Sequence, residues 1–120
     1  MHIKNIEALP PFVSPHGEIV REQMGHSAGG AVQHSMAHIT LPPGKASLKH
    51  YHPVAEESYY ILSGQGRIEL DGTTSILNPS VAVAIPANSI HQIFNEGPAE
   101  LVFLAVCVPP WTPDCSVFVD

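Results

Sequence analysis

Residues 44–64 read GKASLKHYHPVAEESYYILSG and bring two histidines, a glutamate and two glycine turns into one short span. His50 and His52 are two residues apart in a segment with little helical signal, and residues i and i+2 of a strand point to the same face. Pro53 cannot donate to a strand ladder, so the chain is predicted to turn there. Glu57 then begins a second strand, which we expect to run back beside the first.

Two neutral imidazoles and a carboxylate that converge inside a barrel form a ligand set for Fe, Mn, Ni, Zn, Co or Cu. Residues 85–95, IPANSIHQIFN, offer a fourth ligand, because Pro86 and Asn88 mark a turn and His91 begins the strand that follows. The chain has eight histidines, so a His-x-His pair alone says little, and a buried histidine is more often only hydrogen-bonded. The joint spacing of all these residues is what indicates a metal site.

The first stretch resembles the first signature of the cupin superfamily, a spaced pattern of glycine, His-x-His, glutamate and glycine. The positions that match it are Gly44, His50, His52, Glu57 and Gly64. The second signature is matched by Pro86, His91 and Asn95. The resemblance covers roughly residues 31–108, and it implies a small barrel that holds one divalent metal through His50, His52, Glu57 and His91.

Two glycines of the second signature are replaced, by Ser80 and Asn88. Asparagine is the residue other than glycine that best tolerates a positive φ, so Asn88 can keep its turn. Ser80 follows Asn78 and Pro79 in a turn-like triplet. Glu56 also fits the shorter form of the first signature, but the six-residue gap to Gly64 favours Glu57.

The whole pattern predicts an all-β fold of eight to ten short antiparallel strands with little helix, which is a jelly-roll barrel or double-stranded β-helix. A length of 120 residues predicts one domain, 1–120, with an N-terminal arm over 1–30, a barrel core over 31–108 and a C-terminal tail over 109–120. Within the arm we expect one strand around residues 3–6 and a strand or helical turn over 18–24. Later strands are expected over 67–70, 74–77, 81–85 and 100–108, with 81–85 and 100–108 buried on both sides.

The strand predicted over residues 31–41, AVQHSMAHITL, has two informative faces. If the face that carries His34 and His38 points inward, both histidines line the pocket as substrate-binding or proton-transfer groups; if not, they lie on the outside or at a subunit contact. Tyr59 shares a face with Glu57 and is a third candidate for acid–base chemistry, with simple core packing as its alternative. Trp111 in the tail either covers the open end of the barrel or walls the pocket.

A formal charge of −6 with only five Lys and Arg leaves no basic stripe, which argues against a nucleic-acid partner or an anionic membrane surface. The N-terminus lacks an apolar signal region, so we expect a cytoplasmic protein with no membrane association. Cys107 and Cys115 show no CxxC spacing and are expected to be free thiols. The resemblance further implies a homodimer, since the arms of small cupins often cross to a second subunit.

A set of three histidines and one glutamate leaves up to two positions on a six-coordinate metal for a small-molecule substrate. The sequence therefore predicts a metal-dependent enzyme, either a dioxygenase or an isomerase or lyase that uses the metal as a Lewis acid. The alternative is a non-catalytic barrel that binds a small molecule around a structural metal.

Overall fold

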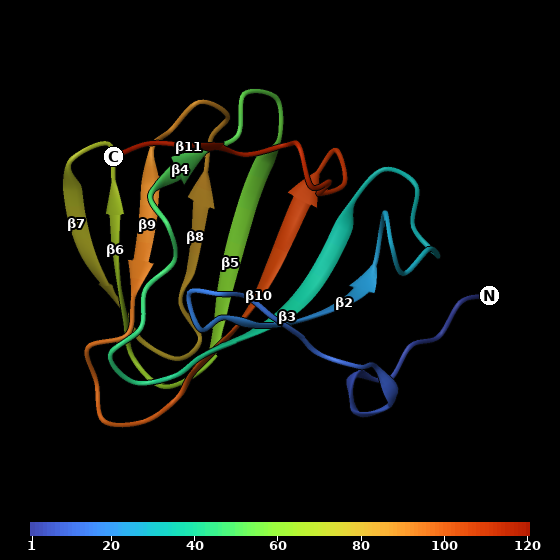
Figure 1. Ribbon diagram of the computed structural model, residues 1–120, viewed down its shortest axis with the longest axis horizontal. Coiled ribbons are helices and arrows are strands. Elements are labelled where there is room, and N and C mark those ends of the chain that lie inside the picture. The colour runs from blue at the N-terminus through green and yellow to red at the C-terminus, as the bar shows by residue number, and fades with distance from the viewer.

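The computed structural model describes residues 1–120 and contains two antiparallel sheets that face each other around a common core (Figure 1). The six-stranded sheet consists, in spatial order, of β1 (Phe12–Val13), β2 (Ile19–Met24), β3 (Ser35–Leu41), β10 (Leu101–Val108), β5 (Glu56–Ser63) and β8 (Ala82–Ile85). The five-stranded sheet consists of β11 (Val117–Phe118), β4 (His50–Tyr51), β9 (His91–Phe94), β6 (Gly66–Leu70) and β7 (Thr73–Leu77). The all-β barrel of antiparallel strands is confirmed.

The only helical element is a single 3₁₀ turn, η1 (Ile6–Ala8), so no helix is long and apolar enough to cross a membrane. The turn replaces the strand predicted around residues 3–6. The first strand of the arm lies further along, at β1. The segment predicted as a strand or helical turn over 18–24 is a strand, β2. The strand propensity of the isoleucines near the N-terminus does not decide the local structure. Asn5 instead caps the 3₁₀ turn by accepting a hydrogen bond from the Glu7 backbone N–H.

The core lies between the sheets and follows the period of two that strands impose. Along β5 and β10 buried and more exposed residues alternate, so every second side chain enters the interior. The buried apolar residues from both sheets form one cluster: Leu41, Tyr59, Ile61, Ile68, Leu77, Ile85, Ile93, Leu101, Phe103 and Ala105.

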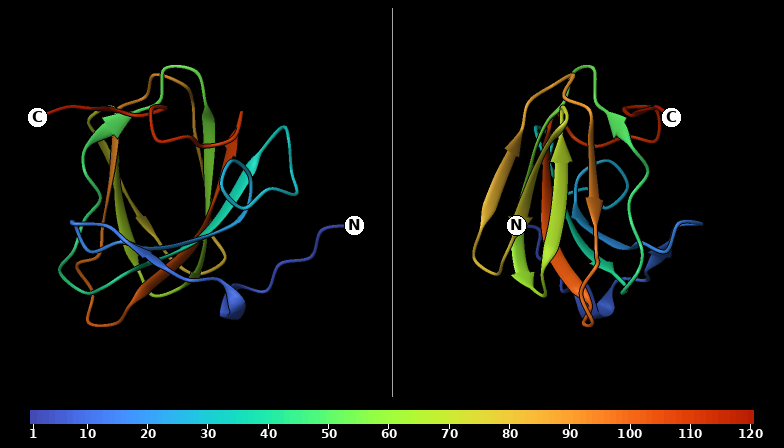
Figure 2. Two further views of the ribbon diagram at one scale, coloured as in Figure 1. Left: turned by 45° about the vertical axis from the view of Figure 1, so that its right-hand side comes forward. Right: turned by 90° about the vertical axis from the view of Figure 1, so that its left-hand side faces the viewer.

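The predicted pairing of the two strands in residues 44–64 is wrong. β5 pairs with β10 and β8, whereas β4 pairs with β9 and β11 in the other sheet. The connection at residues 52–55 therefore crosses from one sheet to the opposite one (Figure 2). As a result Glu57 faces the two histidines across the barrel interior rather than along a hairpin.

The strand predicted over 31–41 begins only at Ser35, because the loop that starts at Gly25 continues to His34. Its inward face carries Ser35, Ala37, Ile39 and Leu41, which pair with the inward residues of β10. His38 points to the opposite face, beside Arg21 of β2 and Leu104 of β10.

Two other strands differ from the prediction. β8 lies at the edge of its sheet, and Ala82 and Ala84 are exposed rather than buried on both sides. β10 is a central strand, but only its inward face is fully buried. A run of apolar letters does not distinguish an edge strand from a central one, because small alanines tolerate exposure.

The residues that replace the two signature glycines keep the backbone conformation that the signature needs. Ser80 and Asn88 have φ values of 73° and 69°, in the left-handed region that favours glycine. The backbone N–H of Asn88 donates to the carbonyl of His52 at 2.8 Å. The turn before β9 is thereby tied to the end of β4, which brings the histidines of the two signatures together.

Candidate metal centre

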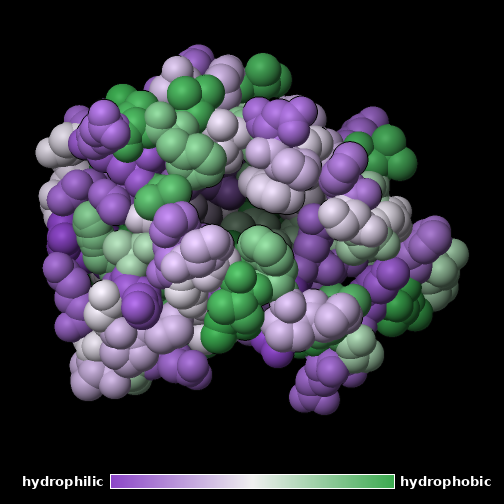
Figure 3. All heavy atoms as spheres, viewed as in Figure 1, coloured by the Kyte–Doolittle hydropathy of each residue, from purple (hydrophilic) through white to green (hydrophobic).

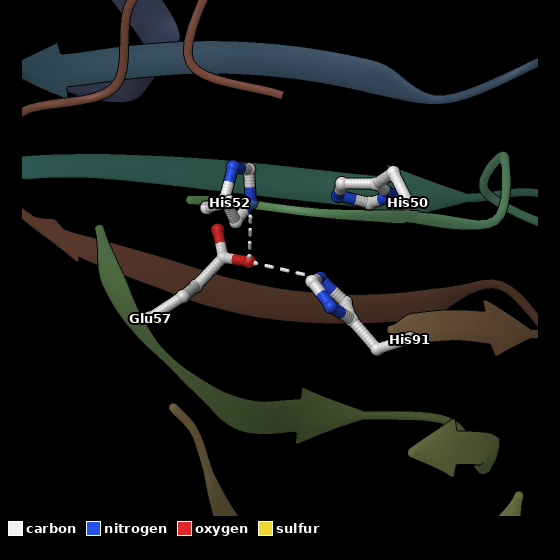
Figure 4. A group of neighbouring side chains, drawn as sticks. All are labelled: His50, His52, Glu57 and His91. Atoms are coloured by element: carbon white, nitrogen blue, oxygen red, sulfur yellow. Dashed lines mark ion pairs between the residues drawn. The ribbon is translucent and has the colours of Figure 1, made fainter. Parts of the chain in front are cut away.

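The four predicted metal ligands converge at one end of the barrel interior (Figure 4). His50 on β4 and His91 on β9 are direct cross-strand partners, with ring centroids 4.3 Å apart. His52 follows β4, and Glu57 enters from β5 in the opposite sheet. One ligand atom from each of these four side chains lies within 4.8 Å of the others.

Three buried polar atoms at the centre of this group have no hydrogen-bond partner: His52 Nε2, Glu57 Oε1 and His91 Nε2. Glu57 Oε1 lies 3.4 Å from each of the two ring nitrogens. The side chains are almost fully enclosed, with exposures of 2% for His52, 6% for Glu57 and 1% for His91. Buried polar atoms without partners are rare and costly, so three that face one another indicate a site for a ligand atom.

The outward nitrogen of each ring is held by the backbone. His50 Nδ1 lies 2.7 Å from the Leu48 carbonyl, His52 Nδ1 lies 3.1 Å from the Cys115 carbonyl, and His91 Nδ1 lies 2.9 Å from the Ser89 carbonyl. A carbonyl only accepts, so each Nδ1 carries the proton and donates it. In the neutral ring Nε2 is then left with a lone pair, which is the tautomer that a metal ligand needs.

The electrostatics separate His50 from His52. Burial, with the neighbouring His91, lowers the pKa of His50 to about 4. Burial also acts to lower the pKa of His52, but the nearby Glu57 carboxylate, whose Oε1 lies 3.4 Å from Nε2, outweighs it and raises that pKa to about 9. Burial acts to raise the pKa of Glu57, but the two nearby imidazoles of His52 and His91 and the hydrogen bond from Cys107 outweigh it and hold that pKa well below its usual range. Without a metal, His52 and Glu57 therefore form an ion pair.

The donor set fits a divalent transition metal such as Fe, Mn, Ni, Zn, Co or Cu. Imidazole nitrogens with one carboxylate suit these metals, whereas Mg²⁺ and Ca²⁺ prefer oxygen ligands. Three buried atoms without hydrogen-bond partners, and Nδ1 hydrogen bonds that turn Nε2 of each ring toward the centre, are what the donors of such a site would show.

The remaining predicted site residues lie at different distances from this centre. Tyr59 follows Glu57 on the inward face of β5, and its ring packs on Phe103 with centroids 4.8 Å apart. Burial and the charge of Glu57 hold the pKa of its hydroxyl well above the usual value. His38 is on the outer face of β3 and His34 lies in the loop before it, so neither lines the site. The sequence does not decide which face turns inward, because Pro42 and Pro43 after the strand allow the alternation to be reset.

Sequence reasoning missed three groups that touch the ligands. The Cys107 thiol donates to Glu57 Oε2 at 3.0 Å. Cys115 and Ser116 in the tail surround His52 Nδ1, with Ser116 Oγ at 3.2 Å. The alternation along β10 could have placed Cys107 inside the barrel, but its partner could not be read from sequence. Glu18, just before β2, is a further partly buried carboxyl; burial chiefly, with the charge of Glu57, raises its pKa.

The molecule offers several concave regions near the site, and His91 lines one of about 180 Å³ together with Lys49 and Gln92. Figure 3 shows a hollow near the centre of one face, in front of β5 and between β4 and the turn that joins β1 to β2. His50 is the only one of the four ligands that is not fully buried. A separate cavity of about 500 Å³ lies between the loops at 25–32, 53–55 and 109–115, with Cys115 in its wall. None of the four ligands lines that cavity.

The backbone of Trp111 connects the tail to the barrel. Its N–H donates to the buried Ser35 hydroxyl at 2.9 Å, which ties the tail to β3, and its side chain is 38% exposed. From there the tail crosses the end of the barrel and joins β4 as strand β11 (Figure 2).

The fold and the arrangement of the site are those of a cupin, and the chain belongs to the cupin domain family, which it matches over residues 37–107. An uncharacterised protein of Methanocaldococcus jannaschii is 31% identical over 106 residues, which cover 88% of this chain and 85% of that one. The oxalate-binding protein of Thermotoga maritima is 29% identical over 107 residues, covering 76% of this chain and 88% of that protein.

Among solved structures, Pac13 of Streptomyces, a nucleoside dehydratase, superimposes with a TM-score of 0.82 at 14% identity. The superposition covers 99% of this chain and 91% of that one. At this identity the likeness shows the fold alone.

Proposed function

We propose that this chain is a metal-dependent enzyme that acts on a small polar organic molecule bound directly at a divalent transition metal. The observation that carries the proposal is the convergence of His52 Nε2, Glu57 Oε1 and His91 Nε2, all buried and none with a hydrogen-bond partner. His50 would complete the ligand set from the half-buried side.

The metal, when bound, would supply Lewis-acid or oxygen-activating chemistry. The residues of the chain would hold it and shape its surroundings. The backbone carbonyls fix the three imidazoles, and the enclosed interior excludes water from their far side. Tyr59 keeps its proton at neutral pH, so its hydroxyl is suited to donating a hydrogen bond and unsuited to acting as a base.

The substrate class we propose is a compact molecule that offers oxygen donors to the metal. Pairs of carboxylate, enediol or hydroxy-keto oxygens satisfy this requirement. The Thermotoga maritima relative is an oxalate-binding protein, which supports such a ligand. It would arrive from the side of His50, the one candidate ligand that is not fully buried.

The first test measures metal content and its dependence on the four ligands. We expect protein purified without added metal to hold close to one transition-metal ion per chain, and the His91→Gln and Glu57→Gln variants to lose it. Oxalate then serves as a probe, and isothermal titration should show binding to the loaded protein but not to chelator-treated protein. A wild-type chain that holds no metal, and binds Zn²⁺ or Mn²⁺ no better than the His91→Gln and Glu57→Gln variants, would refute the proposal.

The reaction type depends on which metal is found. Fe, Ni or Cu with O₂ uptake on an enediol substrate identifies a dioxygenase, whereas Zn or Mn with substrate turnover that consumes no O₂ identifies Lewis-acid isomerase or lyase chemistry. A loaded protein that binds oxalate but turns over no such substrate would be the non-catalytic binding barrel.

We also propose that the protein is a cytoplasmic homodimer. Cys107 and Cys115 are free, which suits a reducing compartment. The outer face of the six-stranded sheet exposes apolar side chains that a second copy would cover, namely Tyr60, Leu62 and Val108. The arm adds an edge strand, β1, whose two residues are both exposed and apolar. Uncovered strand edges readily pair with another chain.

A further inference from the structure

We infer that Cys107 is a positioning residue that fixes which oxygen of Glu57 faces the three histidines. This inference rests on the proposed metal site. It goes further by assigning a task to a thiol that belongs to neither cupin signature.

The contact follows from strand register. Cys107 on β10 is the direct partner of Glu57 on β5, and both side chains enter the barrel. The thiol is 2% exposed, and its sulfur lies 3.0 Å from Glu57 Oε2. Since a carboxylate only accepts, the thiol is the donor.

The two oxygens of Glu57 thus have different surroundings. Oε2 accepts the hydrogen bond from Cys107. Oε1 has no hydrogen-bond partner and lies 3.4 Å from Nε2 of both His52 and His91. With Oε2 held, Glu57 presents a single oxygen to the cluster instead of two.

The thiol has a buried polar neighbour on its far side. Its register partner on β3 is Ser35, which is buried and accepts a hydrogen bond from the backbone of Trp111. A row of inward side chains therefore runs across the sheet from Ser35 through Cys107 to Glu57. Such supporting groups commonly change metal affinity about 10–100-fold when they are removed.

The competing explanation is that Cys107 only fills space, as buried cysteines often do. Serine and alanine at this position separate the two explanations, because they are close in size and differ by one hydroxyl donor. Valine fills the volume without a donor. Val106→Ala is the matched control, since Val106 lies on the same strand with its side chain on the outer face.

The experiment measures Co²⁺ and Zn²⁺ affinity, together with the visible spectrum of the Co²⁺ form. We expect Cys107→Ala and Cys107→Val to weaken binding by about 10-fold or more and to alter the Co²⁺ bands. Cys107→Ser should stay within about threefold of the wild type and keep its spectrum, and so should Val106→Ala. Equal behaviour of the alanine and serine variants, whether both unchanged or both weakened, would overturn the inference.

A second measurement needs no metal, so it separates this inference from the proposed function. In crystal structures of the metal-free variants, the Glu57 carboxylate should turn away in Cys107→Ala and keep its position in Cys107→Ser. An unmoved carboxylate in the alanine variant would refute the positioning role even if the wild type binds metal. A wild type that binds no metal would instead refute the proposed function.

Discussion

Each imidazole of the candidate metal centre is set by one backbone carbonyl. Leu48, Ser89 and Cys115 provide these carbonyls. Two of them lie two residues before the histidine that they hold, so the contact is local. The third comes from the tail, 63 residues further along the chain than His52. The orientation of His52 therefore depends on long-range structure, and that of His50 and His91 does not.

The raised pKa of His52 predicts that metal binding releases a proton. At pH 7 the metal-free ring is protonated, because its pKa is about 9, and a metal needs the free Nε2 lone pair. His50, with a pKa of about 4, is already neutral and releases none. Apparent affinity should therefore rise about 10-fold per pH unit from pH 7 and level off above pH 9.

Titration calorimetry in buffers of different ionisation enthalpy measures this proton directly. Glu57→Gln, at Zn²⁺ concentrations high enough to load the weakened site, provides the control, because the Glu57 carboxylate is the largest of the influences that raise the pKa of His52. Metal binding to that variant should release fewer protons than metal binding to the wild type. An affinity that does not change with pH between 7 and 9 would contradict the assignment of the proton to His52.

Ser80 carries a backbone conformation that glycine would adopt without strain. Its φ is 73°, a conformation in which a side chain destabilises the folded state by about 1–2 kcal/mol. Glycine would relieve this strain, but its greater conformational freedom stabilises the unfolded chain and offsets part of the effect. Ser80→Gly is expected to raise the free energy of unfolding by about 0.5–1 kcal/mol. Asn88→Gly should gain less, because asparagine tolerates this region. Denaturant unfolding of the metal-free protein measures both, and a destabilised Ser80→Gly variant would contradict the prediction.

At the scale of elements, the second strand of the first signature crosses to the opposite sheet. The turn at Pro53 was predicted correctly, and so was the inward face of β5. The partner of that strand was not, because a turn of this length is compatible both with a hairpin and with a crossover between sheets. The crossover is what sets Glu57 opposite the histidines.

Strand β11 connects the tail to the site, so removing the tail should weaken metal binding. A chain that ends at Thr112 lacks the Cys115 carbonyl that holds His52. We expect its metal affinity to fall about 10-fold, as for other groups that support a ligand. The barrel should persist, because β11 pairs only with β4, over two residues.

Metal titration and far-UV circular dichroism of the shortened chain test both parts of this prediction. Phe118→Ala is the control, since it removes a tail side chain from near His50 but keeps Cys115. An unchanged affinity in the shortened chain would show that His52 needs no support from the tail.

At the scale of the whole molecule, the two outer faces differ in their apolar exposure near the middle of the sheets. The six-stranded sheet shows Tyr60 and Leu62, which are 42% and 43% exposed, beside the half-buried Leu104. The outer face of the five-stranded sheet carries the ion pairs of Arg67 with Glu69 and Glu96. The apolar face is the better candidate for covering by a second copy.

Replacing Tyr60 with arginine is expected to convert the proposed dimer to a monomer, because it would place a charge in the centre of an apolar contact. Ile76→Arg is the control, since Ile76 is 50% exposed on β7 of the other sheet. Sedimentation velocity over a range of concentrations measures both variants. A wild type that is monomeric throughout, or an Ile76→Arg variant that dissociates, would contradict this choice of face.

The amino-acid sequence by itself determined the class of fold and the identity of the four converging side chains. It could do so because turns, strand alternation and the spacing of His50, His52, Glu57 and His91 are local properties of the chain. It also predicted the turns at Ser80 and Asn88, which depend on the backbone preferences of single residues.

The tertiary structure alone decided which sheet each strand joins, which face of β3 turns inward and which groups support the ligands. Register between strands far apart in sequence is set by packing over the whole barrel, and a shift of one residue would reverse every side chain. For that reason His38 was found outside the barrel, while Cys107, which no local pattern distinguishes from a packing residue, was found against Glu57.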